Sequence, residues 1–123
     1  MKSNKKIAIS FLQLVTSGKI REAYEKYAAS DFRHHNPWFK GDAKSLQEGM
    51  EENHKQFPNK DFEIKHVLED GEYVAVHSRV QLAPDQPGNA VVHIFRFENG
   101  KIIELWDVGQ QIPKDSPNKN GMF

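Results

Sequence analysis

The sequence contains no cysteine among its 123 residues. Without a thiol, the chain cannot form a disulfide, a cysteine-ligated zinc site or a cysteine nucleophile. It also lacks an excess of charge of either sign, since 17 Lys and Arg residues balance 17 Asp and Glu residues. This balance argues against nucleic acid and anionic membranes as partners, because both are bound mainly through a strongly basic surface.

Long apolar runs and the short motifs of common enzymes are absent too. The chain starts MKSNKKIAISFLQLV, in which Ser10 and Gln13 interrupt any secretory or membrane-spanning core, so a cytoplasmic location is predicted. No HExxH motif, Gly-rich phosphate loop or dinucleotide fingerprint occurs, and we therefore expect no metal and no cofactor. The length suits one domain over residues 1–123.

Apolar residues recur at helical spacing in the first half of the chain. This spacing predicts one helix from Asn4 to Ser17 and a shorter one from Ile20 to about Ser30. Asp42 is expected to cap a third helix that ends before Pro58.

The second half changes to the alternating pattern of strands. We expect a four-stranded antiparallel meander over residues 62–68, 73–82, 90–97 and 101–108, followed by an extended tail over about 110–123. Helices followed by strands predict an α+β domain, with the helices packed on one face of a curved antiparallel sheet.

The turn Glu98-Asn99-Gly100 determines which residues of the last hairpin share a face. We expect a three-residue loop with a glycine bulge, which places His93 and Asp107 as diagonal neighbours on the inner face. In the first hairpin, His66 and Leu68 are expected to point inward and His77 outward.

The outer face of the last two strands is expected to be too apolar for bulk water. An ion pair between Arg96 and Glu104 would lie diagonally on this face, and we infer that a second copy of the chain covers it in a homodimer. The residues expected there are Val92, Ile94, Arg96, Ile102, Glu104, Trp106 and Val108.

Three segments resemble a known family. They are His35-Asn36-Pro37, the run from Ala90 to Ile102, and Glu104-Leu105-Trp106-Asp107-Val108. They are similar to the SnoaL-like polyketide cyclases of the nuclear transport factor 2-like superfamily, in particular to a small bacterial branch described as SnoaL-like aldol-condensation enzymes. The resemblance covers nearly the whole chain and implies a cone-shaped α+β fold with a pocket at its wide end and a dimer formed through sheet faces.

The resemblance also implies roles for two residues. In the polyketide cyclases an aspartate acts as general acid/base near a histidine fourteen positions earlier, and His93 and Asp107 have this separation. Related ketosteroid isomerases use an aspartate in an apolar site to move a proton next to a carbonyl. Each residue also has a plainer interpretation, as a strand-end carboxylate and a partly buried histidine whose hydrogen bonds go to backbone.

The candidate catalytic residues are therefore Asp107, His93 and His35, the last chosen over His34 because we expect it to point inward from the corner before Pro37. That corner is equally compatible with a simple Asx turn. The candidate ligand-binding residues are Asn36, Trp38, Phe57, Val91, Phe95 and Leu105.

We expect an enzyme that performs general acid/base chemistry on a small apolar or cyclic carbonyl compound. The reaction would be an aldol-type cyclisation, a condensation or an isomerisation. The alternative is a non-catalytic module of the same fold that binds a small ligand or a protein, because one fold serves many functions.

Overall fold

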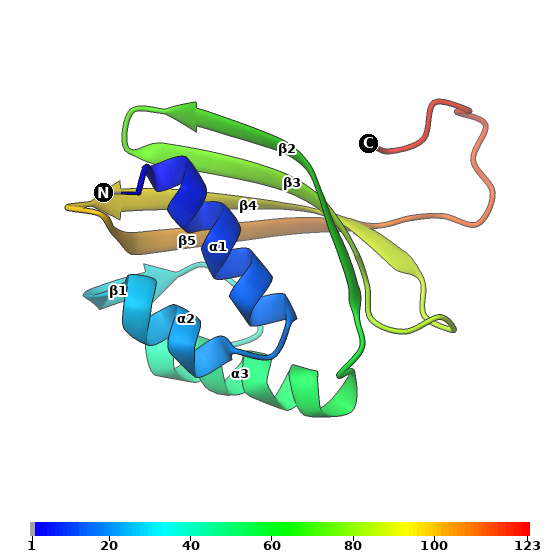
Figure 1. The fold of residues 1–123 in the computed structure, drawn as a ribbon. Helices are drawn as coiled ribbons and strands as arrows, with labels where there is room; N and C mark the ends of the chain where they lie inside the picture. The colour runs from blue at the N-terminus through cyan, green and yellow to red at the C-terminus, as the bar shows by residue number, and fades with distance from the viewer. Residues whose placement is uncertain (1) are drawn as a thin grey trace.

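The computed structural model describes residues 2–123, which form three helices packed against one face of a five-stranded sheet (Figure 1). None of the helices within this range has the length and apolar character needed to cross a membrane. In chain order the elements are α1 (Asn4–Thr16), α2 (Ile20–Tyr27), β1 (Ala28–His34), α3 (Ala43–Gln56), β2 (Asp61–Asp70), β3 (Tyr73–Gln81), β4 (Gly88–Glu98) and β5 (Lys101–Gln111).

The helices α1 and α3 begin and end close to the predicted positions, whereas α2 ends at Tyr27 and not near Ser30, because residues 28–30 belong to β1. The Asp42 side chain accepts a hydrogen bond from the Ser45 amide at 3.0 Å, which satisfies a free donor of the first turn of α3. Gly18 ends α1 with a φ of +92°, and a side chain there would also collide with the His54 ring. Gly18 therefore lets the α1–α2 turn pack directly on α3.

The sheet has one strand more than predicted. Its order is β1-β5-β4-β3-β2, and β1 pairs with β5 in parallel, so the expected antiparallel meander is completed by a parallel edge strand. The sequence of β1, AASDFRH, has no β-branched residue and follows a helical pattern directly. Its pairing partner, rather than its own propensity, makes it a strand.

The last hairpin differs from the predicted loop. Glu98 pairs with Lys101 around a two-residue turn, in which Asn99 and Gly100 have φ values of 52° and 75°, as a type I′ turn requires. A β-bulge follows, because Phe97 pairs with Ile102 and Arg96 with Glu104, which leaves Ile103 as an extra residue.

The bulge restores the facing that the predicted loop would have produced. His93 and Asp107 lie directly opposite each other on the same face, not diagonally, and Arg96 is likewise directly opposite Glu104. Ile102 was wrongly assigned to the outer face; it precedes the bulge and is fully buried in the core.

A second bulge changes the first hairpin. Ile64 pairs with Ser78 and His66 with His77, so Lys65 is the extra residue of β2. The prediction that His66 and Leu68 point inward is therefore wrong: His66 stacks on His77 with ring centroids 5.3 Å apart, and Leu68 is 69% exposed. His77 points outward as predicted.

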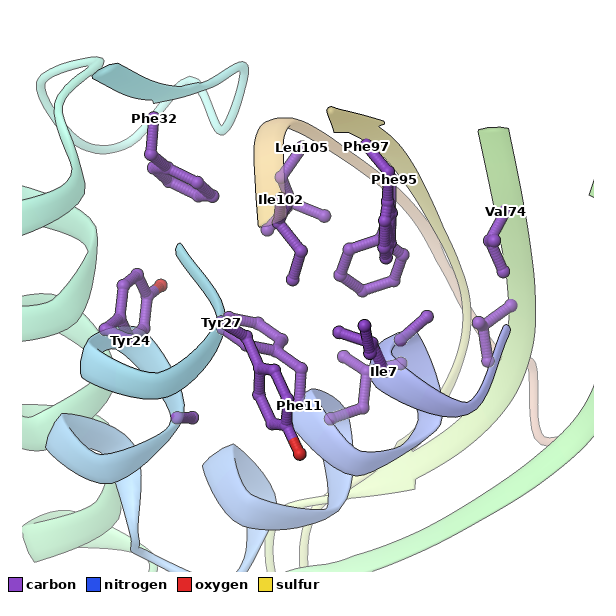
Figure 2. Close-up of a cluster of buried hydrophobic side chains, with 14 of the residues drawn as sticks. Ile7, Phe11, Tyr24, Tyr27, Phe32, Val74, Phe95, Phe97, Ile102 and Leu105 are labelled. Carbon is purple, nitrogen blue, oxygen red and sulfur yellow. The ribbon is translucent and has the colours of Figure 1, made fainter. Parts of the chain in front are cut away.

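Aromatic rings connect the helices to the inner face of the sheet (Figure 2). Phe95 of β4 meets Phe11 of α1 at 5.8 Å, Phe11 meets Tyr24 of α2 at 5.2 Å, and Tyr24 meets Phe32 of β1 at 5.7 Å, all with edge-to-face geometry. Such pairs contribute about 1 kcal/mol each beyond their burial. This chain of rings fills the end of the sheet nearest the β4–β5 turn.

The tail after β5 returns to the outer face of the sheet. The Ile112 amide donates to the Gly88 carbonyl at 2.8 Å, and the last residue, Phe123, lies 5.3 Å from the His77 ring. The tail therefore loops away from the sheet and contacts the outer face through its last residue (Figure 1).

Candidate functional site

His93 and Asp107 form a cross-strand pair on the inner face, where the sheet extends beyond the aromatic core. Val76 of β3 is opposite His93 on its other side, so the histidine lies between an apolar strand and the carboxylate. The distance between opposing residues in an antiparallel pair is about 5 Å at Cβ, which brings an imidazole and a carboxylate within interaction range.

The His93 ring is held in its neutral form by its surroundings. Burial lowers the pKa of His93 from 6.5, and the negative charge of Asp107 opposes this shift only in part. Nδ1 of His93 is buried and has no hydrogen-bond partner among the described residues. A neutral imidazole with an unpaired nitrogen can donate to, or accept from, a bound molecule.

Asp107 also influences a buried phenol. Burial, and then the negative charge of Asp107, raise the pKa of Tyr24 above its usual value of 10.0. The hydroxyl of Tyr24 thus belongs to the same electrostatic environment as His93 and Asp107, a relationship that no pattern in the sequence predicts.

The corner after β1 reaches Asp107 through Asn36. The Asn36 amide nitrogen donates to Oδ2 of Asp107 at 3.0 Å, and its Oδ1 accepts from the Trp38 amide at 3.0 Å. The second bond is an Asx turn. The two interpretations of the corner are therefore compatible, because one side chain both forms the turn and orients the carboxylate.

The expectation that His35 points inward is wrong. β1 pairs His34 with Leu105, so His34 points inward. Its Nδ1 accepts a hydrogen bond from the backbone amide of Asn36, and its Nε2 donates to the Lys40 carbonyl. His35 points to the outer face, where it contacts Glu104 at 2.6 Å and stacks on Trp106 at 5.0 Å. The facing of these histidines depends on the pairing of β1 with β5, which was not predicted.

His93 lines a small cavity of about 190 Å³ between the sheet and the helices. Its other polar lining groups are Thr16, Asn53 and Lys60, and its apolar walls come from both layers. The apolar lining residues are Leu12, Val15, Met50, Phe62, Val80, Leu82 and Val91.

Asp107 opens onto a different space. It lines a surface hollow of about 530 Å³ together with Asn36, Trp38 and Val108, of which Trp38 is 83% and Val108 65% exposed. Val91 lines both the cavity and this hollow. His35, His93 and Asp107 therefore do not share one enclosed cavity, and Val91 is the wall between the last two.

The remaining predicted ligand residues lie elsewhere. Phe95 and Leu105 are buried opposite each other in the core, and Phe57 is the C-cap of α3. None of these three lines the cavity or the hollow. Sequence reasoning missed Lys60, which lies between the helix break at Pro58 and β2 and carried no pattern of its own.

Within residues 2–123, the structure contains no cluster of three or more side chains suited to hold a metal ion. His54 follows the cavity-lining residue Asn53 but does not line the cavity itself. Its ring packs against Gly18, and its Nδ1 has no hydrogen-bond partner among these residues.

Comparison with solved structures identifies the fold. IdmH from Streptomyces antibioticus, provisionally described as a polyketide cyclase, has 16% identity and a TM-score of 0.73, over 89% of this chain and 93% of that chain. A similarly described protein from Acidithiobacillus ferrooxidans has 20% identity and a TM-score of 0.72, over 89% and 90%. An uncharacterised cystatin-fold protein from Novosphingobium aromaticivorans has 20% identity and a TM-score of 0.75, over 88% and 99%.

At these identities the similarity establishes the fold alone, and the neighbours include other NTF2-like proteins of unknown function. No curated protein matches the chain. The family is shown by sequence, because residues 8–105, from within α1 to within β5, match the model of the SnoaL-like domain. The predicted α+β fold and the predicted family are both confirmed, and the chain belongs to the SnoaL-like domain family.

Proposed function

We propose that the chain is a small-molecule enzyme that moves protons on a carbonyl compound, with Asp107 as the base and His93 as its partner. The observation that carries this proposal is the direct pairing of His93 with Asp107 across β4 and β5. The hydrogen bond from Asn36 to Oδ2 supports it, because it orients the carboxylate and leaves Oδ1 for a proton.

The first step would remove a proton from the carbon next to a carbonyl. Asp107 takes the proton, the electron pair of the broken C–H bond moves into an enolate, and a neutral His93 N–H donates to the enolate oxygen. In a condensation, the enolate carbon then bonds to a second carbonyl carbon. In an isomerisation, a conjugated enolate is instead protonated at a different carbon. The proton on Asp107 returns to the new alkoxide in the first case and to carbon in the second.

The ligand would be a small apolar or cyclic carbonyl compound, because the walls of the His93 cavity are mainly apolar. Val91 is common to the cavity and to the Asp107 hollow. A ligand that displaces the Val91 side chain, a change within the range of ordinary rotamer motion, would touch both members of the pair.

Deuterium exchange tests the proposal without knowledge of the natural substrate. Cyclohexanone in D₂O is followed by proton NMR, and wild-type protein is expected to accelerate exchange at the carbons beside the carbonyl. Asp107→Asn should reduce this rate by about 100-fold or more, since general base catalysis contributes a factor of this order. Asp115→Asn, on the exposed tail, is the matched control. Equal rates in wild type and Asp107→Asn would refute the proposal.

The alternative is a non-catalytic module that binds a small ligand or a protein. It is favoured by one observation, that His93 and Asp107 open onto separate spaces. In this case a ligand would raise the melting temperature of wild type and of Asp107→Asn alike, and neither would accelerate exchange.

We propose in addition that two copies associate through the outer face of β4 and β5. This face carries Trp106, which contacts Tyr73, and the exposed side chain of Val108, and none of the helices α1 to α3 covers it (Figure 1). Exposed apolar surface of this kind on a sheet face is typical of an interface between copies.

A further inference from the structure

Lys60 is a charged side chain at the edge of the His93 cavity, and it has no ion pair or side-chain hydrogen bond within residues 2–123. The nearest carboxylates along the chain are already occupied. Asp61 pairs with Arg79 at 2.9 Å, and Glu63 pairs with Lys65. The ammonium group of Lys60 is therefore free to pair with an anion that comes from outside the chain.

The other polar groups of the cavity do not compete for this role. The Thr16 hydroxyl donates to the Leu12 carbonyl at 2.8 Å, so it is satisfied within its own helix. Asn53 carries no charge because an amide does not titrate. His93 is neutral because burial lowers the pKa of its imidazole. Partial burial also lowers the pKa of Lys60, so a counter-ion would stabilise its charged form.

The size of the cavity limits what can enter. A volume of about 190 Å³ is slightly larger than the roughly 150 Å³ engineered cavity known to hold benzene. A single six-membered ring or a short branched chain fits this space. The mainly apolar walls favour such a body over a polar one.

The two ends of the cavity differ in chemistry. Lys60 directly precedes β2, whereas His93 is on β4, and β3 lies between these strands. With neighbouring strands about 4.8 Å apart, β2 and β4 are separated by about 10 Å across the sheet. Asp61, next to Lys60, is level with Gln81 and Gly88, so His93 lies a further five residues, roughly 16 Å, along β4. The two long side chains must reach toward each other to shorten this span. An anionic group at Lys60 and a reacting group at His93 would therefore belong to opposite ends of one small molecule.

We propose that this cavity selects a small apolar carboxylic acid, of monocyclic or short-chain type, whose carboxylate pairs with Lys60 while its other end points to His93. For the reacting end this inference rests on the proposed function, which would make the substrate a keto acid. The carboxylate preference itself depends only on Lys60 and the apolar walls.

Paired probes of equal size test the preference. Benzoate and benzamide are titrated into ¹⁵N-labelled protein at pH 7.5 and low salt, and dissociation constants are taken from amide shifts of Asn53 and Val91. We expect wild type to bind benzoate about tenfold more tightly than benzamide, since charge-assisted pairs are the stronger ones. Lys60→Met should remove this difference by weakening benzoate alone, whereas Lys60→Arg should keep it.

Lys55→Met is the matched control, because Lys55 is exposed on α3 and does not line the cavity. It should preserve the tenfold preference. Equal affinity of wild type for the two probes, absence of saturable binding, or a preference that survives Lys60→Met would each overturn the inference. Asp107→Asn should still prefer benzoate, so loss of deuterium exchange with retained preference would count against the proposed reaction and not against the Lys60 site.

Discussion

The side-chain amide of Asn36 donates a hydrogen bond of 3.0 Å to Oδ2 of Asp107, although the two residues are 71 positions apart. Asn36 lies just beyond β1, and Asp107 lies on β5, the strand with which β1 pairs. The parallel pairing of these two strands is therefore what brings the corner His34-His35-Asn36 to the carboxylate.

This contact predicts that Asn36 is a positioning residue. Asn36→Ala removes the donor and leaves the carboxylate free to rotate, so we expect the exchange rate of cyclohexanone to fall about tenfold, as for a small loss of alignment. Most of the change should be in kcat, because Asn36 would act through Asp107 and not on the ligand. The measurement is the same NMR exchange assay, run over a range of ketone concentrations.

Asn89→Ala is the matched control for this variant. Asn89 lines the same hollow as Asp107 but its amide is directed to the Pro87 carbonyl. Its replacement should leave kcat within about twofold, as for a residue without a contact to the reacting groups. If Asn36→Ala changed only KM, the positioning role would be wrong.

A second prediction concerns the acid stability given by Glu104 on the outer face. Its side chain is 7% exposed, and its carboxylate accepts hydrogen bonds from His35, Arg33 and Arg96. The bond from His35, followed by those from Arg33 and Arg96, lowers the pKa of Glu104 from 4.5 to about 2 against the opposing effect of burial. The folded state thus binds the proton less readily than the unfolded state does.

A lowered carboxyl pKa adds stability that is fully present above pH 4.5 and is lost as the pH falls toward 2. Glu104→Gln should lower the free energy of unfolding by about 2 kcal/mol at pH 7, the size expected for lost charge-assisted bonds. The difference from wild type should shrink between pH 4.5 and pH 2, measured by urea unfolding.

Glu98→Gln, at an exposed end of β4 without a side-chain partner among the described residues, provides the comparison. Its effect at pH 7 should stay within about 0.5 kcal/mol. A Glu104→Gln difference that is the same at pH 7 and pH 2.5 would mean that the ion cluster does not produce the acid dependence.

A third prediction tests the homodimer. Val108 is 65% exposed on the outer face of β5, next to the surface that carries Trp106. Val108→Arg places a charge on each side of the proposed two-fold interface, so sedimentation velocity should show the wild-type dimer replaced by monomer at micromolar concentration. Gln56→Arg, at the end of α3 in the helical layer, should leave the dimer intact. A monomeric wild type would exclude the proposed interface.

Much of the fold was accessible from the sequence because local patterns determine it. The helical periodicity and the Asp42 cap predicted α1 and α3 nearly to their ends, and alternation predicted β3 and β4. β1 was not accessible, since its residues become a strand only through pairing with β5. The facing of His34 and His35 follows from that pairing and was mistaken for the same reason.

For the site, the sequence correctly indicated that His93 and Asp107 share a face of the sheet. It did not indicate which irregularity of the hairpin places them there. The hairpin was expected to gain its odd residue in the loop, whereas it gains that residue in the bulge at Ile103. Of the cavity lining, only His93 and Val91 were identified. Lys60 and the other lining residues were not, because they come from α1, α3 and the strands β2 and β3 or their ends, and become neighbours only in the folded chain.

The bulge at Ile103 determines which face of the sheet Asp107 lies on. In a hairpin with a two-residue turn, opposite residues are separated by an odd number of positions, yet His93 and Asp107 face each other at a separation of fourteen. A relative that lacked the extra residue could retain every side chain of the site and still display its aspartate on the outside of the sheet. An even spacing between the two residues therefore reports one extra residue between them, in the loop or in a bulge, and it can be used to distinguish relatives that place the pair on one face from those that only contain the two residues.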